Sequence, residues 1–298
     1  MDLIARKQKP SSLEQYTRAA ELAAAEVIGA YSTSFGWATK LVGKQIRVHI
    51  RNIYALVRVA DEIVDGAADE ALQGTQPGYT QQALDQLEAE TYLAIESGFS
   101  TNLVVHAFAH TARLSGIKRE IIEPFFTSMR MDIDNREYDQ AGFDKYVYGS
   151  AEVVGLMCLE VYLMELDLTA HEKAEFVRGA RALGAAFQKV NFLRDLAADF
   201  QKLGRSYFPG VNVASFNEEE KHRLVVDIQE DLKVSSSVLK KLPKSSRKAV
   251  AAAQMFFDEL NRKIMATPAE TLISERIRVS NGKKLVILIK AWIGVVPS

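Results

Sequence analysis

Cysteine, excess charge of one sign and long apolar runs are all scarce in this chain of 298 residues. The single cysteine, Cys158, cannot form an internal disulfide, which fits a reducing compartment, and its apolar neighbours suggest a core residue. With 37 Lys and Arg against 38 Asp and Glu, the net charge of -1 provides no field that would attract nucleic acid. No uninterrupted apolar stretch approaches a bilayer span, and residues 1–16 lack a signal-peptide core. We therefore expect a cytoplasmic protein.

Strand-like alternation, internal repeats and Pro/Ser-rich linkers are scarce as well, so residues 1–298 are predicted to form a single all-α domain. Ser12 is the expected cap of the first helix, and Gly66 is expected to end the helix that precedes it. Residues 202–215 are predicted to be irregular, either as a lid over a bound ligand or as an ordinary loop. Later helices are expected at about 101–115, 119–131, 143–164, 169–200, 217–241, 245–265, 271–277 and 283–293.

Two aspartate pairs at helical spacing, Asp61 with Asp65 and Asp195 with Asp199, are the most informative feature that is present. Residues four apart project from one helix face, so the two carboxylates of a pair repel each other unless a cation offsets their charge. Mg²⁺ binds a few carboxylate oxygens and completes its shell with water and phosphate oxygens. One such pair is usually a solvated helix face, but two pairs together favour a site for Mg²⁺, with Mn²⁺ as a substitute.

The neighbours of both pairs strengthen this interpretation. Tyr54 and Arg58 lie on the helical stripe of the first pair, and Gln188 and Asn191 lie on the stripe of the second. Gly184, at the head of the second stripe, allows another group to approach the backbone closely. A cation, a phenol and two amides beside four carboxylates suit the binding of a metal and a diphosphate.

Other kinds of site fit the sequence less well. A di-iron bundle needs two Glu-x-x-His pairs, and the only one here, Glu219 to His222, lies in a charged run. The chain contains no Gly-x-Gly-x-x-Gly motif, and Gly36 to Lys44 lacks the spacing of a P-loop. We therefore expect no nicotinamide cofactor.

Five segments resemble the squalene and phytoene synthases, prenyltransferases that join two prenyl diphosphates head to head, and the likeness is greatest to the phytoene synthases. They are Tyr31–Phe35, Tyr54–Asp65, Tyr146–Gly155, Leu183–Asp199 and Arg205–Pro209. The fourth segment is the specific one, because head-to-tail prenyl synthases have adjacent aspartates there and class I terpene cyclases usually have an Asn/Ser/Glu triad. The resemblance implies an isoprenoid-synthase-type helical bundle around a central apolar cavity, with Mg²⁺ between the aspartate segments.

The resemblance also implies a role for each matching residue. The metal ligands would be Asp61, Asp65, Asn191, Asp195 and Asp199. The catalytic residues would be Tyr54, Arg58, Tyr146 and Tyr207. The substrate-binding residues would be Ser32, Phe35, Arg58, Gln188, Asn191, Arg194, Arg205 and Arg276. The chain departs from the family pattern at Thr33, where many members have Lys, at Ser150 and Glu152, which replace Val and Gly, and at Phe257, which replaces Tyr.

The expected reaction is Mg²⁺-dependent condensation of two geranylgeranyl diphosphates to phytoene through a cyclopropyl diphosphate, as in carotenoid biosynthesis. One alternative uses farnesyl diphosphate to make squalene or dehydrosqualene. Another is a non-catalytic relative that acts as an assembly factor, although such relatives tend to lose aspartates. The stretch Lys283–Ile293 is either a closing helix packed on the core or a peripheral contact with a membrane surface. The sequence does not identify a protein partner.

Overall fold

The computed structural model describes residues 9–32, 38–72, 76, 78–134, 138–203 and 207–297, without the side chains of residues 69, 72, 134 and 197–203. The structure is 79% helical, and no strand occurs among the described residues. The all-α prediction is therefore confirmed. That residues 1–298 form a single domain stays a prediction.

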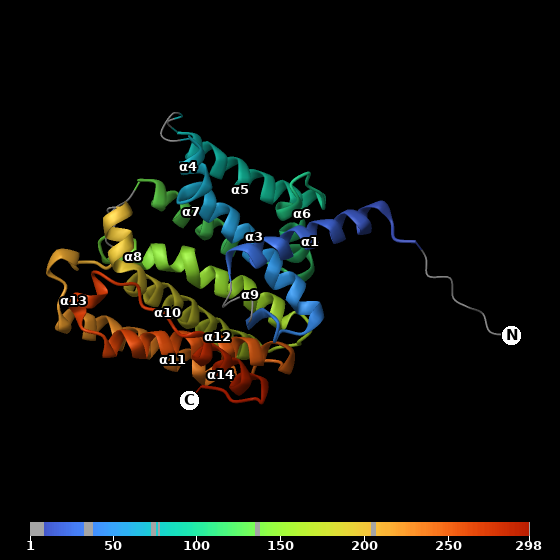
Figure 1. Ribbon diagram of the computed structural model, residues 1–298. Coiled ribbons are helices and arrows are strands. Elements are labelled where there is room, and N and C mark those ends of the chain that lie inside the picture. The colour runs from blue at the N-terminus through green and yellow to red at the C-terminus, as the bar shows by residue number, and fades with distance from the viewer. Residues whose placement is uncertain are drawn as a thin grey trace.

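Figure 1 shows α9 running through the middle of the molecule, with α1, α5 and α6 on one side of it and α10, α11 and α12 on the other. Contacts of α9 with both α3 and α10 agree with this arrangement. The helices are α1 (Ser12–Tyr31), α3 (Lys44–Val64), α4 (Ala67–Leu72), α5 (Tyr79–Ser97), α6 (Leu103–Ser115), α7 (Arg119–Asp134), α8 (Gln140–Val147), the π-helical η1 (Tyr148–Glu152), α9 (Val153–Leu163), α10 (Ala170–Leu203), the 3-10 turn η2 (Val213–Ser215), α11 (Glu218–Leu239), α12 (Lys244–Ala266), α13 (Ala269–Leu272) and α14 (Asn281–Trp292).

The start of α1 lies one residue earlier than predicted. Ser11, not Ser12, is the cap, and its side chain accepts from the backbone N–H of Glu14. The Glu14 carboxylate in turn accepts from the Ser11 backbone N–H at 2.6 Å. Two residue pairs have the spacing of a capping box, Ser11 with Glu14 and Ser12 with Gln15. The pair with the charged carboxylate, Ser11 with Glu14, is the one that forms.

The predicted helix at 143–164 is continuous but contains the π-helical turn η1. The Ser128 hydroxyl of α7 donates to the carbonyls of Tyr146 and Lys145, at 3.2 and 3.4 Å. A π turn leaves carbonyls without their usual helical partner, so this hydroxyl stabilises the wider turn. Gly149 fits here because a Cβ would lie 2.1 Å from the Ser128 hydroxyl oxygen and 2.2 Å from the carbonyl oxygen of Pro124.

The helix predicted at 271–277 is wrong for most of its length, because α13 ends at Leu272 and residues 276–280 are extended or irregular. In this stretch Val279 is buried, Ile277 packs against the core, and Arg276 and Arg278 are exposed. Alternation of this kind suits an extended segment that lies on a surface. The helix predicted at 283–293 is confirmed as α14.

One helix among the described residues, Gln140–Leu163, is long and apolar enough to cross a membrane by length and composition alone. This finding differs from the sequence-based expectation that no uninterrupted apolar stretch approaches the length of a bilayer span. Half of the most apolar window of this helix is buried inside the fold. Core helices have the same composition, and the contacts of α9 with α3 and α10 fit that role.

Candidate active site

A cavity of about 370 Å³ lies between α3, α9, α10, α11 and α12, and most of its wall is apolar. Tyr54 of α3 and Asn191 of α10 line it, so the two aspartate-bearing helices face the same cavity. Phe176 also lines it and precedes Asn191 on α10 by about four turns, roughly 22 Å along the helix axis. Cys158 lines the wall instead of filling solid core, and burial raises the pKa of its thiol to about 12. The thiol is therefore neutral.

Asp61 is partly buried near the end of α3, and its pKa is raised to about 7. Burial is the main cause, Asp65 adds to it, and the guanidinium of Arg58 opposes it. The protein alone therefore does not fully favour the carboxylate form of Asp61. A bound cation would favour it, which is what a metal ligand in a repulsive acidic pair requires.

Arg58 lies beside Asp61 and makes two further contacts. Its guanidinium forms an ion pair with Glu62 and lies over the Tyr31 ring, 4.4 Å from the centroid. Glu62 is not among the predicted site residues, although its position four residues after Arg58 is the usual spacing of a helical ion pair. The hydroxyl of Tyr54 shares a hydrogen bond with the side chain of Ser32, while burial raises the pKa of Tyr54. Residues predicted separately at 32, 54, 58 and 61 thus lie together.

Asp195 is held by two arginines. Arg194 donates to Oδ2 at 2.6 Å. Arg276 forms an ion pair in which its Nε lies 2.6 Å from Oδ1, and its Nη2 donates to Oδ2 at 3.3 Å. Among the described basic residues near the C-terminus, Arg276 is the one that contacts this predicted metal ligand. Arg278, two residues later, is exposed, and its backbone carbonyl accepts from Lys263.

Asn191 presents a buried acceptor on the same helix. Its Oδ1 has no hydrogen-bond donor among the described residues, although Asn191 lines the cavity and lies one turn before Asp195. A buried amide oxygen without a donor is costly, and a cation is one of the partners that would compensate for it. Gln188, three residues before Asn191, is partly buried on α10.

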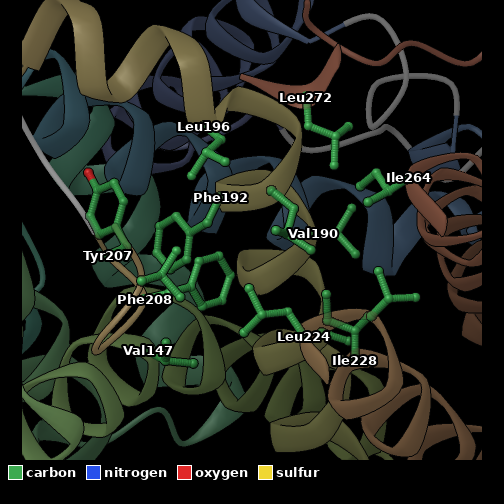
Figure 2. Packing of buried hydrophobic residues seen from close by; sticks show 14 of the residues in the cluster. Val147, Val190, Phe192, Leu196, Tyr207, Phe208, Leu224, Ile228, Ile264 and Leu272 are labelled. Atoms are coloured by element: carbon green, nitrogen blue, oxygen red, sulfur yellow. The ribbon is translucent and has the colours of Figure 1, made fainter. Parts of the chain in front are cut away.

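Tyr146 and Tyr207 lie in an aromatic cluster next to this cavity and are not part of its lining. Tyr207 stacks on Phe192 with ring centroids 4.1 Å apart and an angle of 8° between the rings. Figure 2 shows the two side chains together, with Phe192 on the long helix α10 and Tyr207 on the segment that follows it. The Tyr146 hydroxyl donates to Oδ2 of the buried Asp132 at 2.9 Å. Nothing in the sequence had indicated Asp132.

The residues at which this chain departs from the family pattern lie in different parts of the structure. Ser150 lines the cavity, and its Oγ is buried without a partner among the described residues. Glu152 instead forms an ion pair with Arg181 at 2.6 Å. Phe257 stacks on the cavity-lining Phe187, with centroids 3.7 Å apart. Ser150 and Phe257 therefore affect the cavity outline, and Glu152 does not line it.

Gly184 does allow the close backbone approach that the sequence predicted. A Cβ at this position would lie 2.6 Å from the carbonyl oxygen of Ala151 in η1. The group that approaches Gly184 is therefore the backbone of η1, and Gly184 and Ala151 both line the cavity there.

Some predicted residues lie outside the described part of the chain. They are Thr33, Phe35 and Arg205, together with the side chain of Asp199, whose backbone belongs to α10. Among the described side chains no group of three or more His, Cys, Asp or Glu is arranged to hold a metal ion. In the predicted irregular segment 202–215, Tyr207, Phe208, Val211 and Val213 are buried in the core.

Comparison with known proteins identifies the family. The family profile described as "Squalene/phytoene synthase" matches residues 28–283. The chain belongs to the squalene/phytoene synthase family. This is a family of prenyltransferases, which confirms the predicted enzyme class.

Two relatives illustrate the range of similarity. The 15-cis-phytoene synthase of Pantoea ananas is 26% identical over 288 residues, covering 90% of this chain and 89% of that protein. Phytoene synthase 3, chloroplastic, of Zea mays is 31% identical over 205 residues, which cover 67% of this chain and 45% of that protein. The match thus spans most of the bacterial protein but less than half of the plant protein.

Solved structures share the fold. A dehydrosqualene synthase in complex with ligand superposes with a TM-score of 0.77 at 23% identity, covering 94% of this chain and 98% of that one. A squalene synthase from Alicyclobacillus acidocaldarius gives a TM-score of 0.71 at 18% identity, with 85% and 96% covered. The predicted isoprenoid-synthase-type bundle is therefore confirmed.

The family uses a divalent metal with its prenyl diphosphate substrates, and the donors found here suit such an ion. Asp61 and Asp195 supply carboxylates, and Asn191 supplies a buried amide oxygen without a donor among the described residues. A hard cation such as Mg²⁺ prefers oxygen ligands of these two kinds.

Proposed function

We propose that this protein joins two geranylgeranyl diphosphates head to head to make phytoene, with Mg²⁺ as its metal. The observation that carries the proposal is a single apolar cavity lined by Tyr54 of one aspartate-bearing helix and Asn191 of the other. A charged end would bind the diphosphates, and a dry interior would hold the isoprenoid chains. Family membership and phytoene synthase relatives support the same reaction.

In the first half-reaction, the C–O bond of one substrate breaks and its electron pair leaves with the diphosphate, which generates an allylic cation. A double bond of the second substrate attacks this cation, and loss of a proton closes a cyclopropyl diphosphate. In the second half-reaction this intermediate ionises in turn, rearranges, and loses a proton to give the hydrocarbon. No hydride is consumed, so we propose that no nicotinamide cofactor takes part.

Metal bound by Asp61, Asp65, Asn191, Asp195 and Asp199 would supply positive charge to the departing diphosphate. The arginines have a matching role. Arg58, Arg194 and Arg276 lie beside Asp61 or Asp195, where their guanidinium groups would bind phosphate oxygens. We propose that Ser32, Gln188, Phe35 and Arg205 complete the substrate contacts.

The apolar cavity wall would keep water away from the cation, which water would otherwise convert to an alcohol. Aromatic faces stabilise cations, and we propose this role for Tyr54, Tyr146 and Tyr207. The hydrogen bond between Tyr146 and Asp132 would fix the orientation of that phenol.

The reaction has lipid substrates and a lipid product. We therefore also propose that this protein is located in the cytoplasm and makes peripheral contact with a membrane surface. The word "chloroplastic" in the names of several relatives refers to those plant proteins.

Purified protein incubated with Mg²⁺ and either farnesyl or geranylgeranyl diphosphate, with and without NADPH, tests the proposed reaction. We expect pyrophosphate release and phytoene from geranylgeranyl diphosphate without NADPH. Squalene or dehydrosqualene as the main product would support the shorter substrate instead. Binding of either diphosphate without pyrophosphate release would indicate a non-catalytic relative.

A further inference from the structure

The helix α14 has two apolar faces, and the described part of the chain covers only one of them. Ile287 and Ala291 are buried, and Ala291 packs with Ala38 and with Ala252 of α12. On the other face the exposed fractions are 55% for Leu285, 51% for Ile289 and 65% for Trp292. An amphipathic surface helix normally has polar side chains on its outer face.

Exposed apolar side chains are concentrated on this helix. Among the described residues, 16 large hydrophobic side chains are exposed, and six of them lie between Leu285 and Val295. The other ten are spread over residues 13–226. Single exposed hydrophobic residues are ordinary, but a contiguous group of them usually marks a binding surface.

The charge of the C-terminal segment itself has one sign. Residues 279–297 contain Lys283, Lys284 and Lys290 and no acidic residue. Lys248 of α12 adds a fourth cation, because its Nζ donates to the carbonyl oxygen of Trp292 at 2.6 Å and lies 5.9 Å from the centroid of its ring. Glu259 is the acidic residue that pairs with Lys283, at 3.4 Å.

We propose that the outer face of α14, formed by Leu285, Val286, Ile289, Trp292 and Ile293, docks on an anionic membrane surface. Apolar side chains with Trp and flanking lysines suit the interface between headgroups and acyl chains, and each lysine adds attraction to anionic lipids. A second copy of the chain would fit this surface less well, because two such faces would bring their lysines together.

Docking of this face would also orient the cavity. Ala252 of α12 faces α14, whereas Ala249, Val250 and Ala253 of the same helix line the cavity, as do Ala38 and Val42. The cavity wall is therefore one helix away from the docked face. This consequence rests on the proposed function, since it places a lipid product close to the bilayer that would receive it.

The test is flotation of the full chain with vesicles of phosphatidylcholine alone or of phosphatidylcholine and phosphatidylglycerol in equal parts. We expect wild-type protein to float with the anionic vesicles, and Ile289→Glu/Trp292→Glu to reduce the bound fraction by about tenfold or more. Leu22→Glu/Leu93→Glu is the matched control, because both side chains are 62% exposed and lie on α1 and α5. Thermal unfolding would show that both variants fold.

Fluorescence provides a second measurement. The chain has two tryptophans, Trp37 and Trp292, so a Trp37→Phe variant reports on α14 alone. We expect its emission to shift to the blue when anionic vesicles are added. Equal flotation of wild type and both variants would overturn the proposal, and so would a dimer that is lost in Ile289→Glu/Trp292→Glu without any vesicle binding. Pyrophosphate release in detergent should be the same in wild type and variants, so failure of docking is distinct from failure of the proposed reaction.

Discussion

Arg276 forms an ion pair with Asp195, with its Nε 2.6 Å from Oδ1, although 81 residues separate the two along the chain. Arg194 donates to Oδ2 of the same carboxylate, also at 2.6 Å. Two guanidinium groups thus neutralise a residue that the sequence predicts as a metal ligand. A cation at Asp195 would replace part of this interaction and free Arg276 to bind a diphosphate.

Removal of a predicted metal ligand should abolish turnover without unfolding the protein. We expect Asp61→Asn and Asp195→Asn each to lower pyrophosphate release by about a hundredfold or more, because an amide oxygen binds Mg²⁺ more weakly than a carboxylate. Thermal unfolding should stay cooperative, since neither side chain fills the apolar core. Asp167→Asn, on an exposed residue, is the control and should be fully active. Normal activity of both site variants would refute the metal assignment.

Arg276 and Arg278 should differ in their effect on substrate binding. Arg276→Ala removes a guanidinium that reaches Asp195, so we expect the KM for the prenyl diphosphate to rise by about tenfold. Arg276→Lys should recover only part of this loss, because an ammonium group cannot form the two-pronged contact. Arg278→Ala should leave the KM unchanged. Equal effects at the two positions in steady-state kinetics would contradict the assignment.

Tyr207 should help to keep water from the cation. Tyr207→Ala removes the ring that stacks on Phe192, and the space left would admit water. We expect the products to shift from hydrocarbon towards prenyl alcohol, while pyrophosphate release falls less than hydrocarbon formation does. Tyr207→Phe keeps the stacked ring and should give less alcohol. Mass spectrometry of the products measures the ratio, and an unchanged ratio in Tyr207→Ala would exclude this role.

Gly184 should tolerate no side chain. A Cβ there would lie 2.6 Å from the carbonyl oxygen of Ala151, so Gly184→Ala should lower the free energy of unfolding by about 1–3 kcal/mol. Gly29→Ala is the control, because a Cβ at this position in α1 meets nothing within 4 Å. That substitution should be neutral or add up to about 1 kcal/mol. Denaturant unfolding compares the two, and equal stability of the variants would show that α10 can move away from η1.

His49 should make the fold sensitive to acid. Its pKa is lowered, mainly because burial disfavours the imidazolium and also because His110 is near, while Nδ1 lies 3.0 Å from the Thr111 hydroxyl. The unfolded chain takes up this proton at about pH 6.5, before the folded protein does, so the contribution of His49 is lost as the pH falls below that value.

The measurement is the Tm at about pH 7.5 and about pH 5.5. We expect the wild-type Tm to fall between these two values, and His49→Gln to fall less. His222→Gln, at an exposed position, should behave like wild type. If His49→Gln shows the same decrease as wild type, another group is responsible.

The sequence by itself determined most of the helices and the kind of chemistry. Helical periodicity and capping patterns are local, so they predicted an all-α chain even though the cap of α1 is Ser11 and not Ser12. The spacing of Asp61 with Asp65 and of Asp195 with Asp199 is local too, because four residues along a helix fix a shared face. Residue types at such spacing were enough to predict a site for metal and diphosphate.

Only the tertiary structure decided which distant residues meet. The sequence does not show which of Arg276 and Arg278 reaches the site. The extended course of residues 276–280 brings Arg276 to Asp195. Asp132 carries no sequence signal, yet packing of α7 against α8 buries it beside the Tyr146 hydroxyl. Likewise, the apolar pattern of α14 does not specify which face meets Ala252 and which stays exposed. The physical reason is the same in each case: these contacts depend on how whole helices pack, and local spacing does not encode that.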